Sequence, residues 1–201
     1  MTTQGTLLSW FASEVPMWRL AAAILAVNVL GTALTLPLVR AAAPDAASVV
    51  AGYMWLAATA SPLVAGAKAV LFTALAWSVA ALVGAALDLG RTAAVFLAGE
   101  LVRGMSLVFP GSVLLVRGAD SLRSPADLEV LQGPGLFLDL PPGIGVVVDE
   151  HLGIFALGWI VVTATGLRRV AGSSRIVAVT STAAVWLLGV SWSFLRLGFA
   201  R

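Results

Sequence analysis

The sequence predicts an all-α membrane protein: one bundle of five transmembrane helices with an interfacial helix at its N-terminus. Two observations lead to this prediction. Hydrophobic residues make up 60% of the 201 residues and charged residues only 11%, whereas about a quarter of the residues of a soluble domain are charged. The apolar residues also gather in five stretches, each close to the ~20 residues that a helix needs to cross ~30 Å of hydrocarbon.

Charged and aromatic residues mark where most of the apolar stretches begin and end. Trp18 and Arg19 precede the first stretch, and Lys68 precedes the second. Such side chains favour the headgroup region. The fourth stretch is short, so it needs either a locally thinner bilayer or an extension through Val146–Val148. The five predicted spans are Leu20–Leu38, Ala69–Leu87, Thr92–Val116, Leu152–Leu167 and Ile176–Leu195.

Residues 1–19 are expected to form the interfacial helix, and residues 20–201 the single membrane domain. Apolar side chains recur at helical spacing from Leu7 to Trp18, and Pro16 separates this segment from the first span. One apolar face without enough length to cross is typical of a helix lying in the interface. The first span is longer than the ~7–15 residues of a signal-peptide core, so we expect the segment to be retained.

Two longer loops lie on the face opposite the N-terminus. Residues 117–151 form the third loop, predicted to cap the bundle, with a ligand-binding lid as the alternative. Ser124-Pro125 is a helix start signal within this loop. The first loop, between Val39 and Lys68, is expected to hold a second interfacial helix that ends at Ser61-Pro62.

The distribution of basic residues predicts the orientation. Arg168, Arg169 and Arg175 fill the short turn between the fourth and fifth spans. Positive charges in short loops favour the cytoplasm. The N-terminus shares that face and is therefore expected to be cytoplasmic, with the C-terminus outside.

Six polar residues are candidates for a site or for packing. Glu100 and Arg103 lie three residues apart inside the third span, on one helical face. Charges at this depth usually pair and face the bundle interior, so we expect an ion pair that fixes packing, or else a relay or polar groove. Asp88 and Arg91 form a candidate solvated pair at a turn. Asn28 and Thr32 are candidates for hydrogen bonds between helices.

Other function classes are poorly represented. There is no cysteine, and no nucleophile with a neighbouring base is recognisable, so neither an enzyme nor a cofactor is expected. The single histidine, His151, follows Asp149 and Glu150, and three consecutive side chains on a helix diverge too much to share a metal ion. The net charge of +2, without a block of basic residues, argues against nucleic-acid binding.

The C-terminal third, LGIFALGWIVVTATGLRRVAGSSRIVAVTSTAAVWLLGV, resembles the last two spans of bacterial members of the Ypt-interacting-protein (Yip) family. In that family an aromatic-containing span ends in Gly-Leu and a basic residue, and a short basic turn leads into a final apolar helix. The resemblance extends over Ser61 to Leu188. The matching positions in the two last spans are Phe155, Trp159, Gly166, Leu167, Arg168, Val170, Ser173, Ser174 and Arg175.

The resemblance implies a non-enzymatic scaffold or adaptor of membrane organisation or trafficking-like processes, because eukaryotic relatives associate with Rab-type GTPases and vesicle machinery. Its partners would be the lipid bilayer and either another membrane protein or further copies of the chain. The Ala-, Val- and Arg-rich composition favours a bacterial cytoplasmic membrane. The alternative function is a small transporter or channel subunit built around Glu100 and Arg103. A water-accessible path to Glu100 would favour the alternative, and a dry, closed pair the scaffold.

Overall fold

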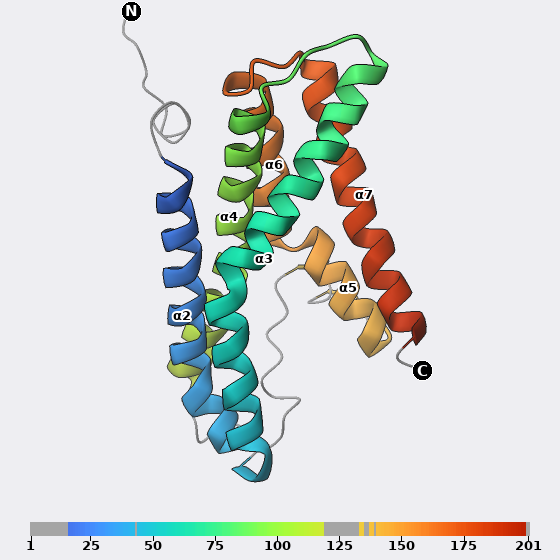
Figure 1. The fold of residues 1–201 in the computed structure, drawn as a ribbon. Coiled ribbons are helices and arrows are strands. Elements are labelled where there is room, and N and C mark those ends of the chain that lie inside the picture. Colours follow the sequence, from blue (N-terminus) through green and yellow to red (C-terminus); the bar gives the residue numbers. More distant parts are fainter. Residues whose placement is uncertain (1–15, 43, 119–132, 135–136, 139, 200–201) are drawn as a thin grey trace, which may run out of the picture.

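The computed structural model describes residues 16–42, 44–118, 133–134, 137–138 and 140–199, and these are helical without any strand. Figure 1 shows the long helices side by side, with α5 about half-way along the bundle between α3 and the end of α7. The elements are α2 (Met17–Ala42), η1 (Pro44–Ala46), α3 (Ala47–Leu82), α4 (Leu89–Arg117), α5 (Pro142–Leu152), α6 (Ile154–Arg169) and α7 (Arg175–Phe199).

The all-helical class and the five long apolar helices are confirmed within the described residues. The helices long and apolar enough to cross a membrane are Met17–Ala42, Pro44–Leu82, Leu89–Arg117, Gly143–Arg169 and Arg175–Leu197. They indicate an integral membrane protein. The predicted interfacial helix lies outside the described residues, apart from its last residues, which open α2. The helix expected after Ser124 also lies outside them.

The second span differs from the prediction. The sequence suggested a break at Ser61-Pro62, yet α3 runs unbroken from Ala47 to Leu82 and is bent part-way along (Figure 1). Pro62 has no N–H to donate to the Ala58 carbonyl. The Ser61 hydroxyl donates to that carbonyl instead, at 2.7 Å, so the helix continues through the proline. Lys68, predicted to mark the start of the span, consequently lies inside a helix.

The fourth span is a broken helix. Gly153 adopts an extended conformation (φ −66°, ψ 164°) between α5 and α6, and Figure 1 shows α5 at an angle to α6. The predicted extension through Val146–Val148 is helical, but as part of α5 rather than as a straight continuation of α6. The end of the predicted loop 117–151 is thus a helix that packs against α6 and α7.

Helix α4 is the centre of the bundle, in contact with α2, α3 and α6. Glycines allow the closest approaches, as small residues do between membrane helices. A Cβ added to Gly99 of α4 would lie 2.8 Å from Trp159 Nε1, and one added to Gly166 of α6 would lie 2.7 Å from a methyl carbon of Val95. Phe72, Phe96 and Trp159 then fill the space between α3, α4 and α6, with ring centroids 5.6–6.4 Å apart.

We expect Gly99→Ala to lower the free energy of unfolding by about 1–3 kcal/mol, because the methyl group overfills a packed contact. Gly66→Ala on α3 is the matched control, since a Cβ there meets nothing within 4 Å. It should be neutral or stabilising by about 0.5–1 kcal/mol through helix propensity. Thermal unfolding of the purified protein in detergent measures both. Equal effects of the two substitutions would contradict the close contact at Gly99.

Candidate functional site

The Glu100 carboxylate on α4 is the most buried charged group of the described residues, with 7% of the side chain exposed. Lys68 Nζ, from α3, donates a hydrogen bond to its Oε2 at 3.1 Å. Arg103 Nη1, three residues further along α4, lies 4.0 Å from Oε1. The Arg103 guanidinium is also stacked over the Trp159 ring, 5.6 Å from its centroid. We call Lys68, Glu100 and Arg103 the charged triad.

The predicted Glu100–Arg103 ion pair is therefore present, but its atoms are further apart than those of a second contact that Glu100 makes. The nearer partner is Lys68, which sequence analysis assigned to a headgroup position before the second span. The error follows from the assumed break at Pro62. A continuous α3 places Lys68 opposite Glu100, and only the pairing of two helices distant in sequence shows this.

The charged triad lies deep in the bundle. Glu100 is eleven residues after Leu89, the first residue of α4, which corresponds to ~17 Å along a helix axis. Lys68 is fourteen residues before Leu82, the last residue of α3, or ~21 Å. Both charges therefore lie well inside their helices, far from either end.

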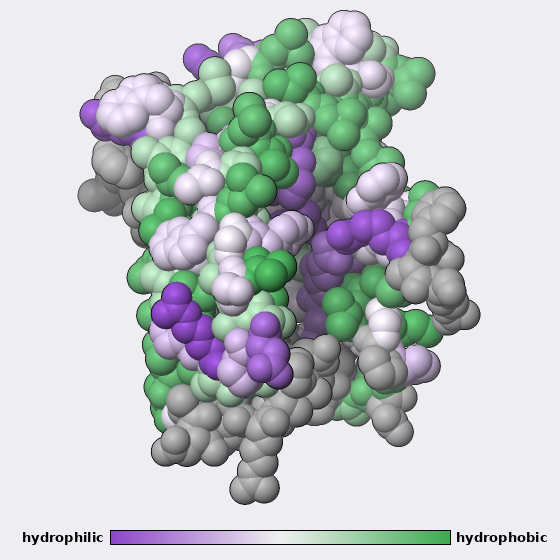
Figure 2. All heavy atoms as spheres, turned by 60° about the horizontal axis from the view of Figure 1, so that its bottom comes forward, coloured by the Kyte–Doolittle hydropathy of each residue, from purple (hydrophilic) through white to green (hydrophobic). Residues whose placement is uncertain are grey.

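A cleft of about 760 Å³ between α3, α4 and α5 is lined by all three residues of the charged triad. One face of α3 forms a long wall, from Tyr53 through Ala57, Ala60 and Val64 to Lys68; this is the spacing of one helical face over four turns. Residues of α2, α4, α5 and α6 complete the lining. Figure 2 shows hydrophilic atoms at the bottom of this hollow, between apolar walls.

Beyond the charged triad the bundle is closed by aromatic packing. Phe72 follows Lys68 by one turn of α3, and Phe96 precedes Glu100 by one turn of α4. Both side chains are buried and contact Trp159. The cleft thus ends at three charges, and the aromatic cluster separates them from the other end of the bundle.

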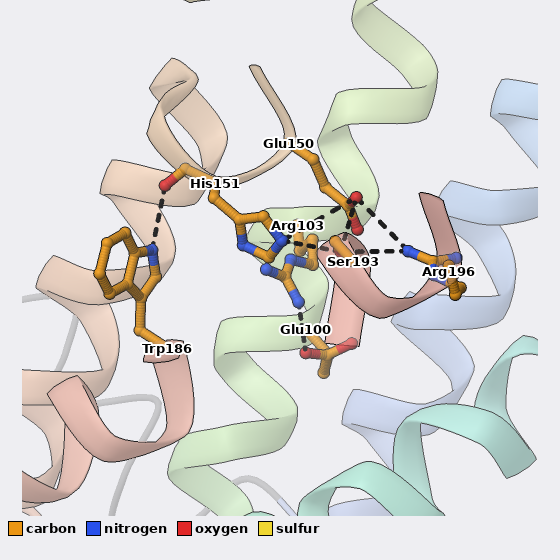
Figure 3. Close-up of polar contacts among 7 residues, drawn as sticks. All are labelled: Glu100, Arg103, Glu150, His151, Trp186, Ser193 and Arg196. Carbon is orange, nitrogen blue, oxygen red and sulfur yellow. Dashed lines mark hydrogen bonds and ion pairs between the residues drawn. The ribbon is translucent and has the colours of Figure 1, made fainter. Parts of the chain in front are cut away.

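A second polar network joins α5 to α7 beside the cleft (Figure 3). Ser193 Oγ donates to Glu150 Oε2 at 3.1 Å and lies 2.9 Å from His151 Nε2. Arg196 Nη2 is 3.2 Å from Ser193 Oγ and 3.5 Å from Glu150 Oε2, and Trp186 Nε1 donates to the His151 carbonyl at 3.0 Å. Arg103 lies next to this network, on its Glu100 side.

This network does not have the arrangement of a hydrolytic triad. In such a triad the carboxylate accepts from the ring nitrogen of the histidine that faces away from the serine, whereas Glu150 accepts a hydrogen bond from Ser193 itself. The other ring nitrogen, Nδ1, has no hydrogen-bond partner among the described residues. The network therefore ties two helices together. Sequence analysis missed it because His151 and Ser193 are 42 residues apart.

The remaining predicted residues have local roles. Asp88 caps α4 by accepting from the Arg91 backbone N–H at 2.8 Å, and the two exposed side chains approach to 3.7 Å. Asn28 Nδ2 donates to the Ile24 carbonyl of its own helix at 2.8 Å, so the bond it makes is within α2. Thr32 is buried on α2. In the described part of the chain no three His, Asp or Glu side chains are placed to share a metal ion.

Comparison with protein families, with curated proteins and with solved structures finds no match to this chain. The resemblance to the Yip family therefore stays a prediction from the sequence.

We expect a double-mutant cycle to rank the two partners of Glu100. Coupling between Lys68→Met and Glu100→Leu should be about 1–3 kcal/mol in the free energy of unfolding, because the two atoms are hydrogen-bonded across helices. Coupling between Arg103→Met and Glu100→Leu should stay below about 1 kcal/mol, as expected of a longer, partly solvated ion pair. Denaturant or thermal unfolding in detergent supplies the values. A larger coupling for Arg103 than for Lys68 would show that the helical neighbour is the main partner.

Proposed function

We propose that this protein is a small membrane transporter, or a transporter subunit, whose substrate chamber is the cleft that ends at the charged triad. The observation that carries the proposal is that this cleft reaches Glu100 from one end of the bundle. Ionisable groups at mid-membrane depth most often mark substrate or ion pathways.

The charged triad lacks the features of a purely structural ion pair. A structural pair in a dry core needs both partners enclosed and all hydrogen-bonding atoms satisfied. Here Lys68 is 41% exposed, and Glu100 Oε1 has no hydrogen-bond partner among the described residues. Both groups line the cleft. Lys68 and Glu100 are therefore placed to bind a ligand that enters the cleft.

The aromatic cluster is suited to act as the closed gate of such a transporter. Alternating access requires a central site that is open to one face and sealed from the other. Phe72, Phe96 and Trp159 supply the seal on the side away from the cleft mouth. Transport would require these rings to part while the mouth closes.

The bacterial cytoplasmic membrane is the proposed location, with the N-terminus in the cytoplasm as the arginines between α6 and α7 favour. The start of α3, α5 and the end of α7 would then face outward. The part of α3 that lines the cleft begins at Tyr53, near that end of the helix. In this orientation the chamber is open to the outside, as in a transporter ready for uptake.

The scaffold role implied by the resemblance to the Yip family, with a membrane-protein partner or self-association, remains the alternative prediction. It requires no water in the cleft and no opening of the aromatic cluster. Accessibility of single cysteines therefore separates the two functions, and the natural chain contains no cysteine to interfere.

We expect Ala60→Cys in membrane vesicles to react rapidly with a membrane-impermeant thiol reagent, because Ala60 lines the cleft. Thr59→Cys is the matched control. Neighbouring residues differ by only about 1.5 Å in depth, but Thr59 is exposed on the opposite face of α3, where lipid would cover it. Equal reactivity of the two cysteines would remove the argument for a hydrated cleft.

A transporter must also expose the far side of the gate. Ala76 is fully buried on α3, beyond the aromatic cluster as seen from the charged triad. We expect Ala76→Cys to react slowly with reagent applied from the face opposite the cleft mouth, because that side becomes hydrated when the gate opens. A reactive Ala60→Cys with a permanently inert Ala76→Cys would indicate a binding protein and would contradict transport.

A further inference from the structure

We infer that the cleft binds a small zwitterion in which a protonated amine is joined to a carboxylate or phosphate group. The inference rests on the proposed function and specifies its substrate class. It follows from two neighbouring groups of opposite sign among the residues that line the cleft. Glu100 Oε1 has no hydrogen-bond partner in the described part of the chain, and the Arg103 guanidinium pairs with it only at 4.0 Å.

Glu100 supplies a buried acceptor. Its Oε2 receives the Lys68 ammonium at 3.1 Å, but Oε1 has no hydrogen-bond partner in the described part of the chain. A buried charged acceptor without a donor is costly, and Glu100 is one of the residues that line the cleft. A ligand N–H carrying positive charge would satisfy Oε1 with a charge-assisted hydrogen bond.

Arg103 supplies the complementary donor. The contacts that the described residues offer its guanidinium are the 4.0 Å ion pair with Glu100 and the Trp159 ring at 5.6 Å, neither of which is a hydrogen bond. With 26% of the side chain exposed, its remaining N–H groups can meet a ligand in the cleft. Guanidinium binds carboxylate and phosphate oxygens through paired hydrogen bonds. The ammonium of Lys68 adds a second positive charge nearby.

The charge of the lining favours a ligand with both signs and little net charge. The lining holds two positive residues, Lys68 and Arg103, and three negative ones, Glu100, Asp149 and Glu150. Arg196, 3.5 Å from Glu150, adds a third positive charge beside the cleft, so the two signs balance. A simple cation would satisfy Glu100 Oε1 but would lie beside two other cations. A simple anion would satisfy Arg103 but leave Oε1 without a hydrogen-bond donor. Because Oε1 and Arg103 Nη1 are 4.0 Å apart, the amine and the anionic group must be close neighbours in the ligand.

The same chemistry occurs in free solutes and in lipid headgroups. A cavity of about 760 Å³ is within the usual size range of small-molecule sites. Apolar residues on the walls, among them Leu56, Val64, Leu107 and Phe155, could receive either a solute's apolar substituent or the chain of a single-tailed lipid. The experiment therefore needs a soluble arm and a lipid arm.

The test is thermal unfolding of the purified full-length protein in detergent, with probes that divide the zwitterion into its halves. β-Alanine is compared with propionate and propylammonium, and glycerophosphoethanolamine with dimethyl phosphate and ethanolamine. At ten times its Kd, a binding zwitterion should raise Tm by roughly 3–6 °C, and its halves at the same concentration should not. Glycerophosphocholine is the control for hydrogen bonding, because its quaternary ammonium has charge but no N–H for Glu100 Oε1.

The lipid arm compares lysophosphatidylethanolamine with lysophosphatidylcholine. A rise in Tm with lysophosphatidylethanolamine alone supports the inference and identifies a lipid headgroup as the ligand. A rise in Tm with a soluble zwitterion supports the inference and identifies a free solute as the ligand. The inference is overturned if no zwitterion shifts Tm, or if one of the halves or a choline compound shifts it equally.

Two substitutions locate the site. Ala60→Phe fills the cleft wall and should abolish the shift, whereas Thr59→Phe, on the opposite face of α3, should preserve it. Glu100→Gln removes the partner of the amine, so the zwitterion should bind roughly ten- to hundredfold more weakly, and propionate or dimethyl phosphate should now bind at least as well. If Glu100→Gln does not fold, the comparison of Ala60→Phe with Thr59→Phe still tests whether the zwitterion binds in the cleft.

Failure of this inference is distinguishable from failure of the transport proposal. A hydrated Ala60→Cys and a reactive Ala76→Cys without any zwitterion-dependent shift would retain transport and reject this substrate class. Inert cysteines would reject the hydrated cleft itself.

Discussion

The hydrogen bond between Lys68 and Glu100 is the contact on which the arrangement of the bundle depends. A carboxylate near the middle of an apolar helix cannot be left without a counter-charge, so α3 and α4 must align at this depth. The alignment requires α3 to be one helix through Pro62, which the Ser61 hydroxyl makes feasible by taking the bond that proline cannot make. The position of the cleft wall along α3 then follows from the same register.

One half of the bundle is closely packed, and the other half contains the cleft with its polar residues. On one side of the charged triad, Gly99 and Gly166 bring α4 and α6 together around three aromatic rings. On the other side α5 leaves the line of α6 at Gly153, and the described residues of α3 and α5 line a cleft. The break at a single glycine therefore separates a sealed region from a hollow one. Without it, a straight fourth span would occupy a different place beside α3 and α4.

The sequence predicted the features that composition and local spacing determine. Five apolar helices and the burial of Glu100 follow from hydropathy and from the cost of an intramembrane charge. What it could not predict depends on pairing between distant segments. Lys68 resembled an interfacial anchor because Pro62 suggested a helix end, and the contact between His151 and Ser193 joins positions with no shared local pattern. The cleft, which needs five helices to enclose it, has no signature in the sequence at all.

The network between α5 and α7 has a mechanical consequence. Glu150 both lines the cleft and accepts a hydrogen bond from Ser193 of α7, while the outer face of α7 carries exposed apolar side chains such as Trp192 and Leu195. Any tilt of α7 must either break these hydrogen bonds or carry α5 with it, turning about Gly153. The position of α7 and the cleft wall that α5 supplies are thereby coupled.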